Sequence, residues 1–249
     1  MSIPRGLAVL LLASGLFPWG AAAAPLENCL KGEAAHRAGE HDLEIELYTR
    51  CIEDDGPNGP QLAVAHNNRG VAHLAKGDLE RAIEDYDRAL SLDPDYAVAY
   101  SNRGMAYLAK GAFVEALRNY DTAIERDPAY GRAYANRCWL YGFMGHGEEA
   151  LADCETSLGL APDDPVTLDS RAFAFWLLED QERARRDLAL ARRLDPARPT
   201  WQERFVAFEK QFSVGYPLGA ASFQSADSHE EKVVRSRARR PAVVRPNPH

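Results

Sequence analysis

Residues 67–94 read NNRGVAHLAKGDLERAIEDYDRALSLDP, and 34 positions later residues 101–128 read SNRGMAYLAKGAFVEALRNYDTAIERDP. The Asn-Arg-Gly triplet at 68–70 and 102–104 has weaker counterparts at 136–138 and 170–172. Two further columns keep the same step, namely Ala82, Ala116, Ala150 and Ala184, and Tyr86, Tyr120, Cys154 and Leu188. A fixed period of this length is the signature of a repeat array.

Each repeat is predicted to contain two helices. Apolar residues of the first clear repeat recur every three or four positions, as on one face of a helix: Leu79, Ala82, Ile83, Tyr86, Ala89 and Leu90. The break at Lys76-Gly77-Asp78 separates this stretch from an earlier helical run, which predicts helix, tight turn, helix. Three of the four repeats close with Asp-Pro. We interpret this pair as an acidic N-cap and a first-turn proline of the following helix.

On these residues the chain resembles the tetratricopeptide repeat (TPR) family, whose pattern has small and aromatic residues at fixed places. In the first clear repeat those places hold Gly70, His73, Ala82, Tyr86, Ala89 and Pro94. The resemblance implies an all-α fold, a right-handed superhelical solenoid of helix-turn-helix repeats. The sequence departs from the family pattern where Cys138 and Ala172 replace the glycine.

The period sets the expected domain boundaries. Four clear repeats occupy 63–96, 97–130, 131–164 and 165–198. A degenerate N-terminal repeat, 24–62, aligns with the first clear one by adding 38, so that Gly32 falls on Gly70 and Tyr48 on Tyr86. Residues 199–212 are predicted to form a C-terminal capping helix, and 213–249, rich in Ser, Gly, Pro and Arg, a disordered basic tail.

The N-terminus is predicted to be a secretory signal peptide, residues 1–23. Arg5 precedes an apolar run from Leu7 to Phe17, and small residues follow at Ala21 to Ala24. The run is shorter than the roughly 20 residues that span a bilayer. We therefore expect cleavage before Ala24, no integral span afterwards, and an exported protein, periplasmic or secreted, of bacterial type. A permanent membrane anchor is the alternative.

The charge distribution argues against nucleic acid as a partner. The chain has a formal net charge of −8, and the part from residue 24 to 210 holds 34 acidic and 22 basic side chains. Such an acidic body repels nucleic acid and anionic lipid. The tail from Gln211 has a net charge of +3.

Four cysteines suggest two disulfides in an oxidising compartment. Cys138 and Cys154 are equidistant from His146 in the middle of a predicted turn, and Cys29 and Cys51 are equidistant from Glu40. Residues equidistant from the turn lie opposite each other in an antiparallel hairpin. We therefore predict bridges Cys138–Cys154 and Cys29–Cys51, with buried free thiols as the alternative.

No catalytic, cofactor or metal site is predicted. His66 and His73 share a helix face, but two imidazoles fall short of the usual three or four metal ligands. The glycines at 142, 145 and 147 lack the lysine and the preceding strand of a phosphate loop. No arrangement of nucleophile, base and orienting group rises above chance, so we predict that the protein is not an enzyme.

The predicted binding site is a groove. In the family that the chain resembles, the first helix of each repeat lines a concave surface, and members that grip a carboxylate use Lys and Arg beside Asn. The equivalent positions here predict a partner-binding set: Asn68, Asn102, Met105, Arg132, Asn136, Trp139, Phe173 and Trp176. Core packing is an alternative role for the aromatic members. The column of Arg69, Arg103, Arg137 and Arg171 is predicted to be structural, bridging acidic residues of adjacent helices.

These observations favour an exported, non-enzymatic adaptor that holds a protein or peptide partner in its groove. One alternative is a structural or assembly component of an envelope complex, whose basic tail docks on anionic polymer or membrane. Another is a hydrolase or transferase that uses unrecognised residues. Neither the partner nor the oligomeric state is indicated by the sequence.

Overall fold

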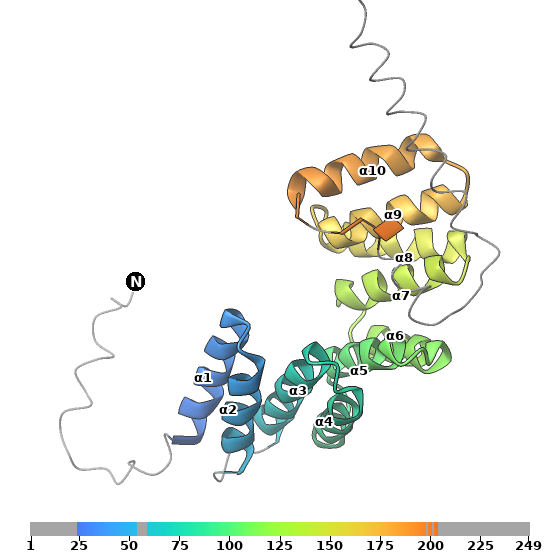
Figure 1. The fold of residues 1–249 in the computed structure, drawn as a ribbon. Helices are drawn as coiled ribbons and strands as arrows, with labels where there is room; N and C mark the ends of the chain where they lie inside the picture. The colour runs from blue at the N-terminus through green and yellow to red at the C-terminus, as the bar shows by residue number, and fades with distance from the viewer. Residues whose placement is uncertain (1–23, 54–58, 198, 201, 204–249) are drawn as a thin grey trace, which may run out of the picture. The chain divides into compact units, whose positions relative to one another are not determined.

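The computed structural model describes residues 24–53, 59–197, 199–200 and 202–203. Over these residues the protein has ten α-helices and no strand (Figure 1), which confirms the all-α helix-turn-helix fold. The helices are α1 (Ala24–Ala38), α2 (His41–Glu53), α3 (Pro60–Ala75), α4 (Leu79–Leu92), α5 (Ala97–Ala109), α6 (Phe113–Arg126), α7 (Gly131–Phe143), α8 (Gly147–Leu160), α9 (Pro165–Leu177) and α10 (Gln181–Leu194). None of the helices in the described part is long and apolar enough to cross a membrane.

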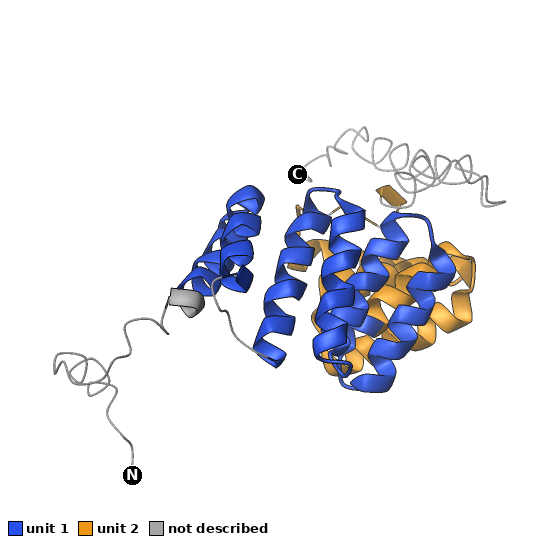
Figure 2. Ribbon diagram, turned by 90° about the horizontal axis from the view of Figure 1, so that it is seen from below, with its two compact units in different colours: residues 1–133 blue, residues 134–249 orange. Residues whose placement is uncertain are grey.

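The helices follow the 34-residue period of the sequence. Helices α5, α7 and α9 start at residues 97, 131 and 165, and α4, α6, α8 and α10 start at 79, 113, 147 and 181. Consecutive helices pack as hairpins, α1 with α2, α3 with α4, α5 with α6 and α9 with α10. The chain divides into two compact units, residues 1–133 and 134–249 (Figure 2), which are called unit 1 and unit 2 below.

In unit 1 a glycine and a tyrosine close each hairpin. A Cβ atom added to Gly32, Gly70 or Gly104 would lie 3.0, 2.8 or 2.6 Å from the ring of Tyr48, Tyr86 or Tyr120, respectively. The rings of Tyr86 and Tyr120 are fully buried. Glycine at these positions therefore lets the aromatic ring of the second helix lie directly on the backbone of the first.

In the α7–α8 hairpin the equivalent positions are cysteines. Cys138 replaces the glycine and Cys154 the tyrosine, and their Cα atoms lie 5.5 Å apart, at disulfide distance. The other pair, Cys29 and Cys51, connects α1 and α2 with a Cα separation of 5.4 Å. The structure thus brings together both of the pairs that the sequence predicts.

The hairpin turns use a left-handed residue. Gly39, Gly77, Gly111 and Gly145 have φ between 72° and 83°, a region that glycine adopts without strain. The last hairpin keeps this geometry with Glu179 at φ 62°. Glu179 thus adopts a conformation that is unfavourable for a residue with a side chain, at a place where the other hairpins use glycine.

The interpretation of Asp-Pro as the start of a helix is wrong. Asp93 is the C-cap of α4, Pro94 lies in the turn, and α5 begins only at Ala97. The Asp93 carboxylate accepts from the N–H of Asp95 at 3.1 Å, and Asp127 accepts from Ala129 in the same way at 3.0 Å. These aspartates therefore form Asx turns between helices, because a side chain two residues upstream satisfies the N–H group.

The predicted signal peptide and basic tail lie outside the described residues, as does most of the predicted capping helix 199–212.

Candidate functional site

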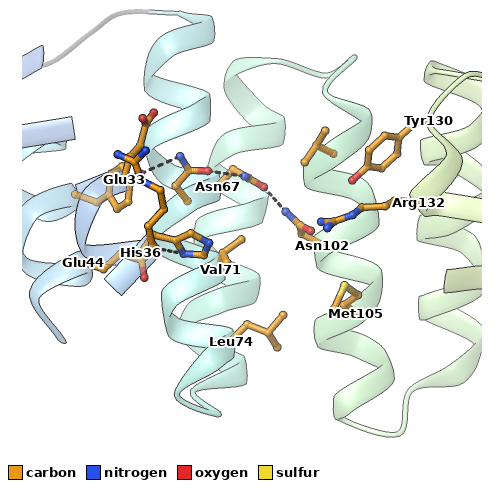
Figure 3. Close-up of a pocket in the computed structure, with 14 residues that line it drawn as sticks. Glu33, His36, Glu44, Asn67, Val71, Leu74, Asn102, Met105, Tyr130 and Arg132 are labelled. Carbon is orange, nitrogen blue, oxygen red and sulfur yellow. Dashed lines mark hydrogen bonds and ion pairs between the residues drawn. The ribbon is translucent and has the colours of Figure 1, made fainter. Parts of the chain in front are cut away.

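Unit 1 contains a pocket of about 570 Å³, called the unit 1 pocket below (Figure 3). Its walls come mainly from the first helices of successive hairpins, α1, α3 and α5, together with α2 and the start of α7. The lining residues are Glu33, His36, Arg37, Glu44, Tyr48, Asn67, Asn68, Val71, Leu74, Val98, Asn102, Met105, Tyr130 and Arg132. The period of 34 residues places first helices side by side, so that equivalent positions line one surface.

A chain of hydrogen bonds crosses this pocket (Figure 3). Asn102 Nδ2 donates to Asn67 Oδ1 at 2.9 Å, Asn67 Nδ2 donates to Asn68 Oδ1 at 3.1 Å, and Asn68 Nδ2 donates to the Tyr48 hydroxyl at 3.1 Å. We call these four residues the asparagine chain. Burial raises the pKa of Tyr48 to about 12, although the bond from Asn68 opposes this shift. The Tyr48 hydroxyl therefore stays neutral and can still donate its own hydrogen.

Glu44 forms one wall, beside α1. Its side chain is only 1% exposed, and its two carboxylate oxygens lie 2.9 Å from His36 Nδ1 and 3.1 Å from His41 Nδ1. Both carboxylate oxygens of this buried group therefore have hydrogen-bond partners. Glu33 stands exposed on the same side of the pocket (Figure 3).

The other wall contains Tyr130 and Arg132. Arg132 is exposed at the start of α7, and Figure 3 shows it beside Asn102. Burial raises the pKa of Tyr130, while the positive charge of Arg132 opposes the shift. Val71, Leu74, Val98 and Met105 supply the apolar part of the lining. The pocket thus offers amide groups, a methionine that is 41% exposed, and a cation.

Four residues of the predicted partner-binding set line this pocket: Asn68, Asn102, Met105 and Arg132. The other four, Asn136, Trp139, Phe173 and Trp176, belong to unit 2. Trp139 and Trp176 are half-buried, with ring centroids 5.7 and 6.2 Å from that of Phe173.

The expectation that Phe173 faces a partner is wrong, because its side chain is fully buried. The cause is Gly142, which occupies a column that holds Leu74, Leu108 and Trp176 in other repeats. A Cβ atom on Gly142 would lie 3.0 Å from the Phe173 ring. The missing side chain of α7 leaves room for the ring from α9, so Phe173 is a core residue.

Sequence reasoning missed the contribution of the degenerate first repeat. The alignment by 38 residues places Glu33 on Val71, His36 on Leu74 and Glu44 on Ala82. Continuing the groove columns into this repeat would have identified Glu33 and His36 as lining residues. Glu44 gives a different signal, since a glutamate in a column of four alanines needs polar partners inside the hairpin.

The arginine column is structural, as predicted. Arg69, Arg137 and Arg171 each make two hydrogen bonds to an aspartate on the second helix of the same hairpin, at distances from 2.6 to 2.9 Å. Those aspartates are Asp85, Asp153 and Asp187. In the second clear repeat Arg103 meets Asn119 at 2.8 Å and also pairs with Asp87. The bonds fix the spacing of the two helices.

The two histidines of α3 take part in this packing. His66 Nδ1 lies 3.1 Å from Asp85 Oδ1, and His73 Nε2 lies 4.0 Å from Asp85 Oδ2. Burial lowers the pKa of His73, although Asp85 and Asp78 oppose the shift. The described residues contain no group of three or more His, Cys, Asp or Glu side chains that could hold a metal ion.

Comparisons with known proteins support the TPR family. A model described as TPR repeat matches residues 70–111, and one described as tetratricopeptide repeat matches residues 97–130. The fold is similar to that of a thermophilic TPR protein of Thermus thermophilus, with 21% identity and a TM-score of 0.61 over 74% of this chain and 98% of that one. MamA is also similar, with 20% identity and a TM-score of 0.54 over 70% of this chain and 93% of that one. At these identities the structures show a shared fold.

Proposed function

We propose that this protein is a non-enzymatic TPR adaptor, and that the unit 1 pocket binds an extended segment of a protein partner. Solenoids of this kind present long surfaces to other proteins. The observation that carries the proposal is the asparagine chain, which places three side-chain amides in a line across one pocket.

The amides keep the capacity to bind a backbone. Each has two N–H donors and an oxygen with two lone pairs, and each asparagine of the chain donates one N–H to a neighbour. The remaining donor and acceptor of an amide match the C=O and N–H of a peptide bond. Successive amides therefore suit a segment whose backbone groups are free, that is, one in extended conformation.

The rest of the lining selects side chains. Met105 and Val71 offer an adaptable apolar surface for hydrophobic side chains of the partner. Arg132 beside Asn102 provides a site for an acidic side chain or a carboxyl terminus.

A crosslinking experiment with the full chain tests this site. A photoreactive amino acid replaces Met105, which is exposed and lines the pocket, or Val114, which is 57% exposed and lies on α6 outside it. The Met105 probe is expected to capture one partner segment, identified by mass spectrometry, and the matched Val114 probe is not. The captured segment, made as a peptide, should bind about tenfold more weakly to Arg132→Glu. Equal capture by both probes, or full binding by Arg132→Glu, would reject the site.

Unit 2 supplies a second proposed contact region, formed by Trp139, Trp176 and Asn136. The two half-buried tryptophans flank Phe173, and large aromatic side chains dominate binding energy where they are accessible. Trp176→Ala should weaken partner capture about tenfold without loss of helical content. Unfolding of unit 2 by this variant would show that Trp176 is a core residue.

We further propose that the protein acts after export. The apolar N-terminal run and the two cysteine pairs at disulfide distance support this location. The intact mass of the purified native protein is expected to correspond to a chain that starts at Ala24. A mass that includes Met1 would contradict export through this segment.

A further inference from the structure

Of the three equivalent tyrosines of unit 1, Tyr48 has a hydrogen-bond partner for its hydroxyl, whereas Tyr86 and Tyr120 have none within the described residues. The Tyr48 hydroxyl accepts from Asn68 at 3.1 Å. The Tyr86 side chain is fully buried, and its hydroxyl has no hydrogen-bond partner in the described structure. An unpaired buried hydroxyl is unfavourable, so the difference needs an explanation.

The repeat period identifies the partner that Tyr86 lacks. Asn102 and Tyr86 are the counterparts, one repeat later, of Asn68 and Tyr48. By this correspondence, the amide of Asn102 is the expected donor to the Tyr86 hydroxyl. Asn102 donates instead to Asn67 Oδ1 at 2.9 Å. The first hairpin has no such competing acceptor, because the counterpart of Asn67 there is Cys29, which lies at disulfide distance from Cys51.

Tyr86 lies directly beneath the unit 1 pocket. It packs in a core cluster with Ala82 and Ala106, and Val71 and Leu74 pack against this cluster. Val71 and Leu74 also line the pocket. Tyr86 therefore belongs to a core cluster against which two lining residues of the pocket pack.

We propose that Asn102 is a two-position switch that couples binding at Asn67 to the buried hydroxyl of Tyr86. In the free pocket the Asn102 amide donates to Asn67. Asn67 is only 3% exposed, so a ligand N–H group that donates to Asn67 Oδ1 competes with Asn102 for the accessible side of this oxygen, and the displaced Asn102 amide turns to the Tyr86 hydroxyl. The bond from Asn102 to Asn67 is replaced by two bonds, one from the ligand to Asn67 and one from Asn102 to Tyr86. Tyr86 therefore contributes to the affinity for the ligand although it does not line the pocket.

The switch defines the chemistry of the ligand at one position. The group that meets Asn67 must carry a hydrogen, as an ordinary peptide N–H does and the nitrogen of proline does not. This specification rests on the proposed function, in which the ligand is an extended segment. The switch itself is a property of the free protein and can be tested without a ligand.

The test is a double-mutant cycle by thermal unfolding of the full chain, with Tyr86→Phe measured in the native background and in an Asn67→Ala background. Alanine occurs at the equivalent position Ala135, so the repeat tolerates the Asn67→Ala background. Tyr120→Phe removes another buried hydroxyl without a partner and is the matched control.

In the native background Tyr86→Phe should leave the Tm unchanged or slightly raised, because the lost hydroxyl is unpaired. Without the Asn67 amide, Asn102 bonds Tyr86, and Tyr86→Phe should lower the Tm by about 2–4 °C. Tyr120→Phe should have the same effect in both backgrounds. An equal change in Tm for Tyr86→Phe in both backgrounds would overturn the switch, but it would not affect the proposed binding role of the pocket. Conversely, absence of crosslinking at Met105 would overturn the binding role of the pocket and would not affect the switch.

Discussion

The hairpins α5–α6 and α7–α8 share one 34-residue frame, yet different chemistry holds their helices together at the same two positions. In the first, the buried ring of Tyr120 lies on Gly104, and in the second, Cys138 faces Cys154. Each contact requires both of its residues, because the tyrosine ring fits only over a glycine and a disulfide needs two cysteines. The comparison shows that the repeat specifies a distance between two helices, which either shape or a covalent bond can maintain.

The largest expected effect comes from breaking the glycine–tyrosine contact. Tyr120→Ala removes a fully buried aromatic ring and leaves a cavity over Gly104, which should lower the free energy of unfolding by about 3–5 kcal/mol. Urea unfolding followed by circular dichroism measures the loss. Tyr107→Ala, at a half-buried tyrosine of α5, is the control and should lose much less. Equal losses would mean that the contact with Gly104 has no special role.

The second prediction breaks the covalent counterpart. Cys138→Ala combined with Cys154→Ala should lower the free energy of unfolding by about 3 kcal/mol, since the bridge closes a loop with a sequence separation of 16 residues. A reducing agent should destabilise the native protein at least as much, and should act on the double variant only through the Cys29–Cys51 pair. Peptide mapping without reduction should find Cys138 joined to Cys154. Two alkylatable thiols at these positions would contradict the bridge.

These two hairpins also show how far the sequence predicts the structure. The 34-residue period predicts helix order and hairpin pairing, and the equal distances of the cysteines from the turns predict both cysteine pairs. The burial of Phe173 depends on a missing side chain at Gly142, in the neighbouring repeat, and a column of equivalent residues does not show that space. The unit 1 pocket depends on Glu44 and Tyr48 of a degenerate repeat, where polar side chains replace apolar ones and weaken the pattern.

The third prediction concerns the arginine–aspartate pairs, starting with Asp85. Burial would raise the pKa of Asp85, but hydrogen bonds from His66 and Arg69 outweigh it, so that the pKa lies below the ordinary value of 3.8. A carboxyl with a lowered folded-state pKa stabilises the fold above its unfolded-state pKa, and this stability is lost as the pH falls through the folded-state pKa. Asp85→Asn should therefore cost about 2 kcal/mol at neutral pH, and its cost should diminish in strong acid. Urea midpoints for both proteins at neutral and acidic pH measure the difference, and a constant difference would contradict the assignment.

The smallest expected effect is that of Asn119→Asp, which gives α5–α6 the carboxylate that α7–α8 has in Asp153. Asn119 Oδ1 already accepts from Arg103 Nε at 2.8 Å, and its Nδ2 donates to the Glu115 carbonyl at 2.8 Å. An aspartate would gain a two-bond ion pair like that of Arg137 and lose the bond to the carbonyl. Because a bond to a charged group is worth about 1.5–3 kcal/mol and a neutral bond about 1 kcal/mol, the net gain should be about 1 kcal/mol. Thermal unfolding at neutral pH should show a higher Tm, and the gain should vanish with Arg103→Met. A lower Tm would mean that the bond to the Glu115 carbonyl outweighs the ion pair, and that asparagine is the better partner of Arg103 in this hairpin.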